Sequence, residues 1–179
     1  MKALVFDTET TGLIDNHSRR LSDQPEITEI YLGLADLDNG QVSGEFDQLL
    51  KPRKHSSRKV TGITGITEKM LADMPSFAFY ADQIRAMIEE APAVLAHNLS
   101  FDMEIVDLEF ERIDQPTPKW PDRKICTVEQ TCHMIGRRIS QMDLHELLFD
   151  EKFDEAHRAG PDTKALIRIA TELNKRGLL

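Results

Sequence analysis

The chain has 179 residues, 40% of them hydrophobic, and a formal net charge of −9. This length suits one domain with a sizeable core, expected to span residues 1–179, and no apolar run is long enough to cross a membrane. The acidic balance argues against a passive nucleic-acid binder, because such proteins usually carry a basic face.

The first part of the chain predicts a strand, a loop and a hairpin. Residues 2–8 read as a strand that is apolar on both faces, and the polar residues 14–26 are expected to form a surface loop. The pair Asn39-Gly40 favours a tight turn, so residues 27–37 and 41–50 are expected to pair antiparallel.

A turn and two helices are expected next. Residues 62–67, with the sequence GITGIT, indicate a turn, and a short helix is expected to start at Thr67. Apolar residues recur at spacings of three and four between Ser76 and Glu90, which predicts a helix with Ser76 as its cap.

The remaining residues alternate between strands and helices. In chain order, these are a short buried strand at 93–98, a helix at 99–113, a proline-rich break at 115–122, a strand leading into a helix at 125–135, a short helix at 143–149 and a last helix from about Pro161 to Arg176. A hairpin followed by such an alternation predicts an α/β fold, in which a mixed sheet of antiparallel and parallel strands is flanked by helices.

Two acids stand at the end of the first strand. Asp7 and Glu9 are two residues apart, so their side chains point to the same face of the strand, close to the core. A bare carboxylate is costly there, so something must neutralise both groups.

Two further acids stand at helix starts and have a reason to point inward. Asp162 shares a helix face with Leu166, Ile169 and Leu173, which places it on the buried side of the last helix. Asp102 follows the buried strand 93–98, and ligands bind at the ends of such strands in open α/β sheets. The alternative for each acid is a favourable interaction with the helix dipole alone.

Four converging carboxylates would repel one another and raise each other's pKa, so hard divalent cations are the expected remedy. All-oxygen ligation suits Mg²⁺ or Mn²⁺. Two such ions, ~3.5–4 Å apart, form a clamp for displacement at phosphorus, in which one ion activates the attacking water and the other steadies the leaving oxygen.

A histidine near the last of these acids can serve as the general base. His157 precedes Asp162 by five residues, on the loop that leads into the last helix, and histidine titrates close to working pH. A lone loop histidine is more often a surface residue, and the nearby Asp162 is what favours a catalytic role. His97 is expected to fix the loop that presents Asp102.

A basic stretch interrupts the acidic composition. Residues 51–59 form either a solvated loop or a local patch that contacts phosphates. Its five cations are Lys51, Arg53, Lys54, Arg58 and Lys59.

These residues, in this order, resemble the DEDDh (DnaQ-like) family of 3′→5′ exonucleases, which includes the proofreading epsilon subunit of bacterial DNA polymerase III. FDTETTGL resembles the first motif, HNLSFDMEIV the second and AHRAGPDTKAL the third, and ITGIT matches a segment between the first two. The resemblance covers residues 4 to about 170. It implies a ribonuclease-H-like fold and the release of nucleoside 5′-monophosphates from the 3′ end of single-stranded DNA or RNA, with DNA favoured.

The resemblance also implies roles for individual residues. It makes two Mg²⁺ or Mn²⁺ ions the cofactors and His157 the general base. Their ligands would be Asp7, Glu9, Asp102 and Asp162. Thr8 and Thr10 would hold the terminal nucleotide, while Leu13 and Phe101 would pack against the terminal bases.

The chain also departs from the family pattern. Thr64 stands where many relatives carry a histidine, and the insert 14–26 is longer than in compact relatives. The chain ends soon after the last helix, so tethering to a polymerase through a C-terminal tail is not expected, and a homodimer or another polymerase association stays open. The sequence predicts a cytoplasmic location for two reasons. Its two cysteines have neither a disulfide framework nor metal-ligand spacing, and its N-terminus is too short for a secretory signal.

Three other functions compete with a DNA exonuclease. An exoribonuclease acting on short or structured RNA 3′ ends would share all of the motifs. A phosphatase of the haloacid-dehalogenase type wants a second Asp where this chain has Glu9, and also a later Lys and an acidic Gly-Asp pair that are not found. A non-catalytic binding module with the same fold would show no Mg²⁺-dependent release of mononucleotides.

Overall fold

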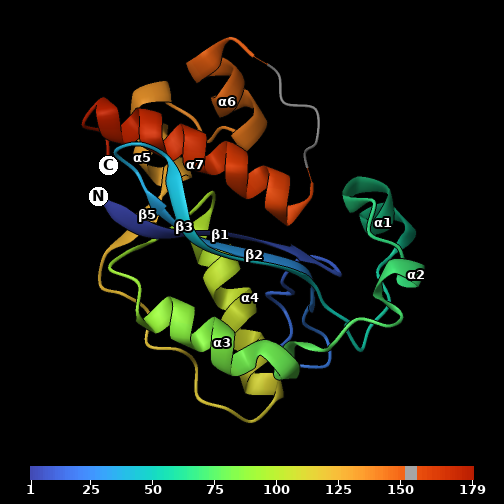
Figure 1. Cartoon of the computed structure of the whole chain (residues 1–179). Coiled ribbons are helices and arrows are strands. Elements are labelled where there is room, and N and C mark those ends of the chain that lie inside the picture. Colours follow the sequence, from blue (N-terminus) through green and yellow to red (C-terminus); the bar gives the residue numbers. More distant parts are fainter. Residues whose placement is uncertain (152–156) are drawn as a thin grey trace.

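A five-stranded mixed sheet runs through the computed structural model, which describes residues 1–151 and 157–179 (Figure 1). The strand order is β3-β2-β1-β4-β5. The strands are β1 (Lys2–Thr10), β2 (Ile27–Asp36), β3 (Gln41–Leu49), β4 (Val94–Ala96) and β5 (Lys124–Cys126). β1, β2 and β3 pair antiparallel, whereas β1 pairs with β4, and β4 with β5, in parallel. The predicted hairpin and the predicted mixed sheet are both confirmed.

Helices cover both faces of this sheet (Figure 1). One face carries α3 (Phe77–Glu89) and α4 (Leu99–Arg112). The other carries α7 (Ala159–Lys175), with α5 (Thr127–Ile135) and α6 (Gln141–Phe149) beside it. Two short helices, α1 (Arg58–Thr64) and α2 (Glu68–Leu71), lie beyond one end of the sheet. No helix among the described residues combines the length and the apolar character that a membrane span requires.

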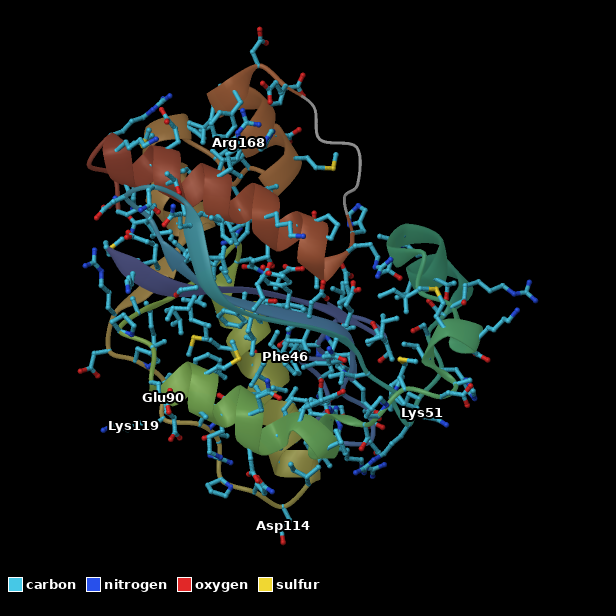
Figure 2. All side chains as sticks on the ribbon, in the orientation of Figure 1. Phe46, Lys51, Glu90, Asp114, Lys119 and Arg168 are labelled. Atoms are coloured by element: carbon cyan, nitrogen blue, oxygen red, sulfur yellow. The ribbon has the colours of Figure 1, made fainter. Side chains whose placement is uncertain are left out.

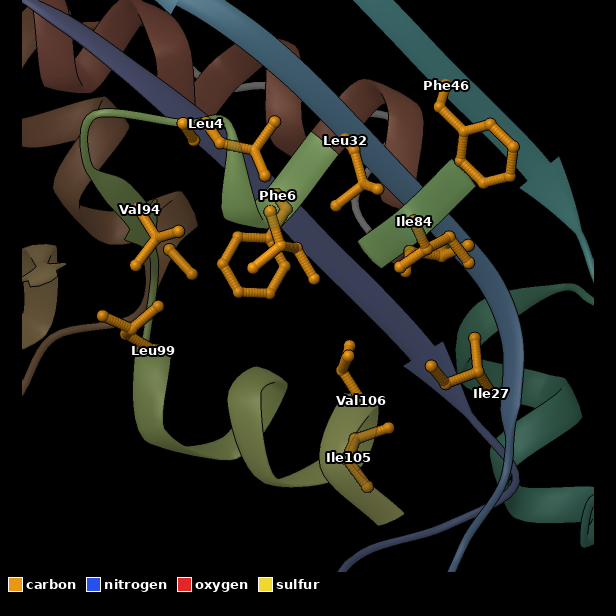
Figure 3. Close-up of a cluster of buried hydrophobic side chains, with 14 of the residues drawn as sticks. Leu4, Phe6, Ile27, Leu32, Phe46, Ile84, Val94, Leu99, Ile105 and Val106 are labelled. Carbon is orange, nitrogen blue, oxygen red and sulfur yellow. The ribbon is translucent and has the colours of Figure 1, made fainter. Parts of the chain in front are cut away.

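The alternation of side chains along β1 decides which helix layer each residue meets. Leu4 and Phe6 belong to the core on the side of α3 and α4, together with Ile84 and Val106 (Figure 3). Ala3 and Val5 pack on the opposite side, against the apolar face of α7. Because the period of a strand is two residues, the odd-numbered acids that follow in β1 point to the α7 side as well.

The structure corrects one local prediction and shifts several boundaries. Residues 62–67 are not all a turn, because Gly62 to Thr64 form the last part of α1. The Ser57 hydroxyl caps this helix by accepting a hydrogen bond from Val60 N, and the helix ends only at Gly65, whose φ of +69° suits glycine.

Other element ends differ from the prediction by one or two residues. β1 extends to Thr10, so both acids lie within the strand. The α6 helix begins at Gln141, after a capping Ser140, and α7 begins at Ala159. Thr67 caps α2 as expected, whereas Ser76 occupies the N-cap position of α3 without a capping side-chain hydrogen bond.

Candidate active site

The end of β1 supplies the first two acids of the site. Asp7 and Glu9 belong to β1, and they line one pocket together with Asp162 from the first turn of α7. Both residues are partly buried, and Glu9 lies opposite Glu29 in the register of β1 and β2. The strand therefore holds both carboxylates on one face, as the spacing predicted.

The neighbouring strand brings the third acid to the same place. β4 runs parallel to β1, and the chain turns through Asn98, whose φ is +73°, into α4. Asp102, in the first turn of that helix, is only 3% exposed. Its Oδ1 accepts hydrogen bonds from Thr8 N at 3.1 Å and from Thr8 Oγ1 at 2.8 Å. The second motif is thus fastened directly to the first.

The fourth acid and the histidine come from the start of α7. Asp162 Oδ2 accepts a hydrogen bond from His157 N at 2.8 Å. One possible ligand atom from each of Glu9, His157 and Asp162 lies within 4.8 Å of the others. A pocket of about 310 Å³ is lined by these three residues and by Asp7 and Thr8. The structure therefore brings both ends of the chain to one cavity, and the buried Asp102 is joined to this cavity through Thr8.

Burial raises the pKa of all four carboxyl groups, and repulsion by the other acids of this set adds to it at Asp7 and Glu9. The Glu9 pKa rises to about 8, mainly through burial and then through the charges of Asp162, Glu29 and Asp102. The Asp102 pKa rises to about 7 because burial outweighs the hydrogen bonds from Thr8. Burial raises the pKa of Asp7 well above its ordinary value, with the charge of Asp102 as the next cause, and burial also raises the pKa of Asp162. A site that disfavours its own negative charge in this way is suited to divalent cations.

The residues expected to meet the bases line a second hollow of about 310 Å³. Leu13 is 84% exposed, and it lines this hollow with Ile14 and Phe101. Thr10 is buried, and its hydroxyl donates to Gly12 O at 2.6 Å, which shapes the turn that carries Leu13. Contacts of Thr8, Thr10, Leu13 and Phe101 with a nucleotide stay predictions.

His97 makes the contacts expected of a structural histidine. Its Nδ1 lies 2.8 Å from Thr127 Oγ1, and its Nε2 lies 3.1 Å from Ile139 O. A carbonyl can only accept, so the ring proton belongs on Nε2, and burial lowers the His97 pKa. The ring ties the end of β4 to the start of α5 and to the segment that leads into α6.

Sequence reasoning missed several residues around the site. Ser140, Gln141 and Met142, from the start of α6, line the pocket, and Gln141 Nε2 donates to Asp162 O at 2.8 Å. Glu29 is buried in β2 and pairs with Arg158. A charged residue within a mostly apolar strand was the available signal for Glu29, whereas the sequence of α6 contained no such signal.

The basic stretch is ordered by contacts with main-chain carbonyls. Lys51 Nζ donates to Ala72 O at 2.6 Å, and Lys54 Nζ donates to Gln24 O at 2.9 Å. Together with Lys69 these lysines line a hollow of about 400 Å³. Carbonyl acceptors leave the ammonium charges in place, and the three lysines outnumber the single acid that lines the hollow, Glu68, so the hollow is basic.

The link between this stretch and the site runs through Glu26. Arg53 N donates to Glu26 Oε2 at 2.5 Å, and Glu26 N donates to Thr11 Oγ1 at 3.0 Å. Thr11 belongs to the turn that follows β1. Figure 2 shows Lys51 on the side of the molecule where α1 and α2 lie, whereas Lys119 lies on the other side.

Comparison with known proteins gives concordant results. The model of the exonuclease family RNase_T matches residues 4–170. DNA polymerase III PolC-type from Staphylococcus aureus is 30% identical over 110 residues, which are 62% of this chain and 7% of that protein. The chain therefore spans only a small part of these curated relatives.

Solved structures share the fold over nearly the whole chain. The nuclease domain of 3′hExo, a DEDDh family member, bound to rAMP, has a TM-score of 0.79 at 15% identity and covers 98% of this chain and 92% of that one. Exonuclease X in complex with 5′ overhanging duplex DNA has a TM-score of 0.64 at 24% identity and covers 98% and 93%. This similarity confirms the predicted ribonuclease-H-like fold.

Proposed function

The chain belongs to the exonuclease family RNase_T, and from that premise we propose that it is a 3′→5′ exonuclease of the DEDDh type, which degrades single-stranded nucleic acid, DNA in preference to RNA, to nucleoside 5′-monophosphates. One observation carries this proposal. Three acids and a histidine from the first and third motifs line one pocket of about 310 Å³, and Asp102 of the second motif is hydrogen-bonded to Thr8, which lines the same pocket.

The residues present fit the divalent ions that this chemistry requires. Asp7, Glu9, Asp102 and Asp162 offer only oxygen atoms, the ligand type that Mg²⁺ and Mn²⁺ prefer. The raised pKa values of Glu9 and Asp102 indicate a site that gains from added positive charge. When bound, two such ions would activate the attacking water and stabilise the leaving oxygen.

His157 takes the proton of the attacking water in this mechanism. Its side chain is exposed to the pocket, beside Glu9 and Asp162, so a water at the scissile phosphate lies within reach. The hydrogen bond from His157 N to Asp162 links the position of the base to that of the fourth acid.

Leu13 and Phe101 hold the terminal bases through apolar contact and stacking. Stacking on an aromatic ring tolerates any base and contributes ~1–3 kcal/mol per base, which suits an enzyme that must accept every sequence. The basic hollow around Lys51 and Lys54 contacts phosphates further along the strand.

The alternative substrate is RNA. Similarity to part of a DNA polymerase favours DNA, whereas one structural neighbour is bound to rAMP, which keeps an exoribonuclease as the second candidate. The two differ in how the terminal 2′-hydroxyl is met.

The deciding experiment uses 5′-labelled single-stranded DNA and the matching RNA, each with Mg²⁺ or with chelator. We expect products that shorten from the 3′ end, release of nucleoside 5′-monophosphates, faster loss of DNA than of RNA, and no reaction with chelator. Faster loss of RNA would select the second candidate. No shortening of either strand in Mg²⁺ would refute the proposal.

A further inference from the structure

A fifth acid lies on the same face of the sheet as the catalytic carboxylates. Glu29, in β2, is directly opposite Glu9 in β1, and it is only 2% exposed. An unpaired carboxylate at this position would add to the repulsion within the site.

The contacts of Glu29 differ from those of the other acids. Arg158 Nε donates to both Glu29 oxygens, at 3.0 and 2.9 Å, and Arg158 Nη2 donates to Oε1 at 2.5 Å. Ala159 N donates to Oε2 at 2.9 Å. With four hydrogen bonds from three N–H donors on its two oxygens, this carboxylate has little capacity left for a metal ion.

These contacts fasten the segment that carries the histidine. Arg158 occupies the N-cap position of α7 and directly follows His157, whose φ is +71°. Asp162 N donates to Arg158 O at 2.9 Å, and His157 N donates to Asp162. The turn is thus joined to the sheet through Glu29 and to its own helix through Asp162.

Gly160 lets the helix come this close to the sheet. A Cβ added at this position would lie 2.8 Å from Asp47 Oδ2 and 3.8 Å from the ring of Tyr31. The start of α7 therefore rests on β2 and β3 at the point where Glu29 receives Arg158.

We propose that Glu29 and Arg158 are a positioning pair, which holds His157 in place beside Asp162 and Glu9. The inference rests on the proposed function, in which His157 is the base and Asp162 a metal ligand. Arginine suits this task because its planar guanidinium spans both carboxylate oxygens, whereas a lysine ammonium is a single point charge.

The main test is Arg158→Lys, which keeps the charge and loses the two-point contact. We expect kcat to fall about 10-fold or more, because small misplacements of catalytic groups are costly, while KM for a single-stranded oligonucleotide changes less than about 2-fold. The matched control is Arg176→Lys, at the C-cap of the same helix, where Arg176 pairs with Glu172 at 2.8 Å on the surface. This control should keep wild-type kcat.

A double-mutant cycle separates positioning from general destabilisation. If Arg158 acts by placing His157, Arg158→Lys should cost less than about 2-fold once His157 has been changed to Ala. An equal cost in both backgrounds would overturn the proposal. If Arg158→Lys folds poorly, Glu29→Gln replaces it in the same cycle, with the same expectations. This substitution keeps the shape of the side chain and removes its charge.

A second measurement reports the position of the His157 ring and does not depend on turnover. Mn²⁺ bound to the carboxylates should broaden the NMR signals of the His157 ring in the wild type and in Arg176→Lys. In Arg158→Lys this broadening should be clearly reduced, and broadening equal to that of the wild type would contradict the pair's role. A wild type that binds Mn²⁺ but does not shorten nucleic acid would refute the proposed function alone, because the broadening still reports the position of His157.

Discussion

Replacing Glu9 with Gln should inactivate the enzyme and stabilise the metal-free protein. The folded protein raises the Glu9 pKa from its ordinary value of 4.5 to about 8, through burial and neighbouring negative charges. Between these two values the unfolded chain has released a proton that the folded chain still holds. The free energy of unfolding of the metal-free wild type therefore falls as pH rises from about 5 to about 8.

The size of this effect follows from the same pKa values. Each pH unit within the window corresponds to about 1.4 kcal/mol, which sets an upper bound of about 4 kcal/mol at pH 8. Glu9 is only partly buried, so solvent screening reduces the expected gain of Glu9→Gln to about 2 kcal/mol. For a domain of this size, that gain raises Tm by about 4–8 °C.

Thermal unfolding in chelator at pH 5 and pH 8 measures this prediction. Glu9→Gln should melt above the wild type at pH 8 and close to it at pH 5, and Mg²⁺ should raise the Tm of the wild type more than that of the variant. Glu146→Gln, a change at an exposed position of α6, is the matched control and should leave the pH dependence unaltered. A variant less stable than the wild type at pH 8 in chelator would refute the electrostatic account of the site.

Three further predictions concern catalysis and binding. Asp162→Asn should abolish hydrolysis while circular dichroism and Tm show a folded protein, and near wild-type turnover in Mg²⁺ would contradict its assignment as a ligand. His157→Ala should slow hydrolysis by roughly 10²-fold or more and remove the acidic limb of the pH–rate profile, and a retained limb would exclude His157 as the base. The double substitution Arg53→Gln with Lys54→Gln should lower the slope of log Kd against log salt for single-stranded DNA by about 1.4, because each single-strand phosphate contact contributes ~0.7. An unchanged slope would show that this stretch does not contact phosphates.

Strong local patterns made most of the fold predictable. The Asn39-Gly40 turn fixed the β2–β3 hairpin, and the apolar spacing along α3 and α7 gave both helices with small boundary errors. The turn predicted at 62–67 was wrong in part, because the capping Ser57 starts a helix earlier and Gly65 ends it later than the GITGIT pattern suggested.

The candidate site was predictable only in its charged residues at strand ends and helix starts. Asp7 and Glu9 ended an apolar strand, Asp162 shared a helix face with apolar residues, Asp102 followed a buried strand, and the three motifs gave their order. The residues that hold these acids in place could not be predicted from the sequence, because they act through contacts between distant segments. Glu29 meets Arg158 across 129 residues, and Gln141 meets Asp162 from a helix with no distinctive motif.

The most direct test of the account is the anomalous scattering of crystals of the protein grown or soaked with Mn²⁺. We expect two peaks, ~3.5–4 Å apart, between the carboxylates of Asp7, Glu9, Asp102 and Asp162. Peaks located elsewhere, or none at these four side chains, would contradict the claim that this cluster is built to hold a pair of divalent cations.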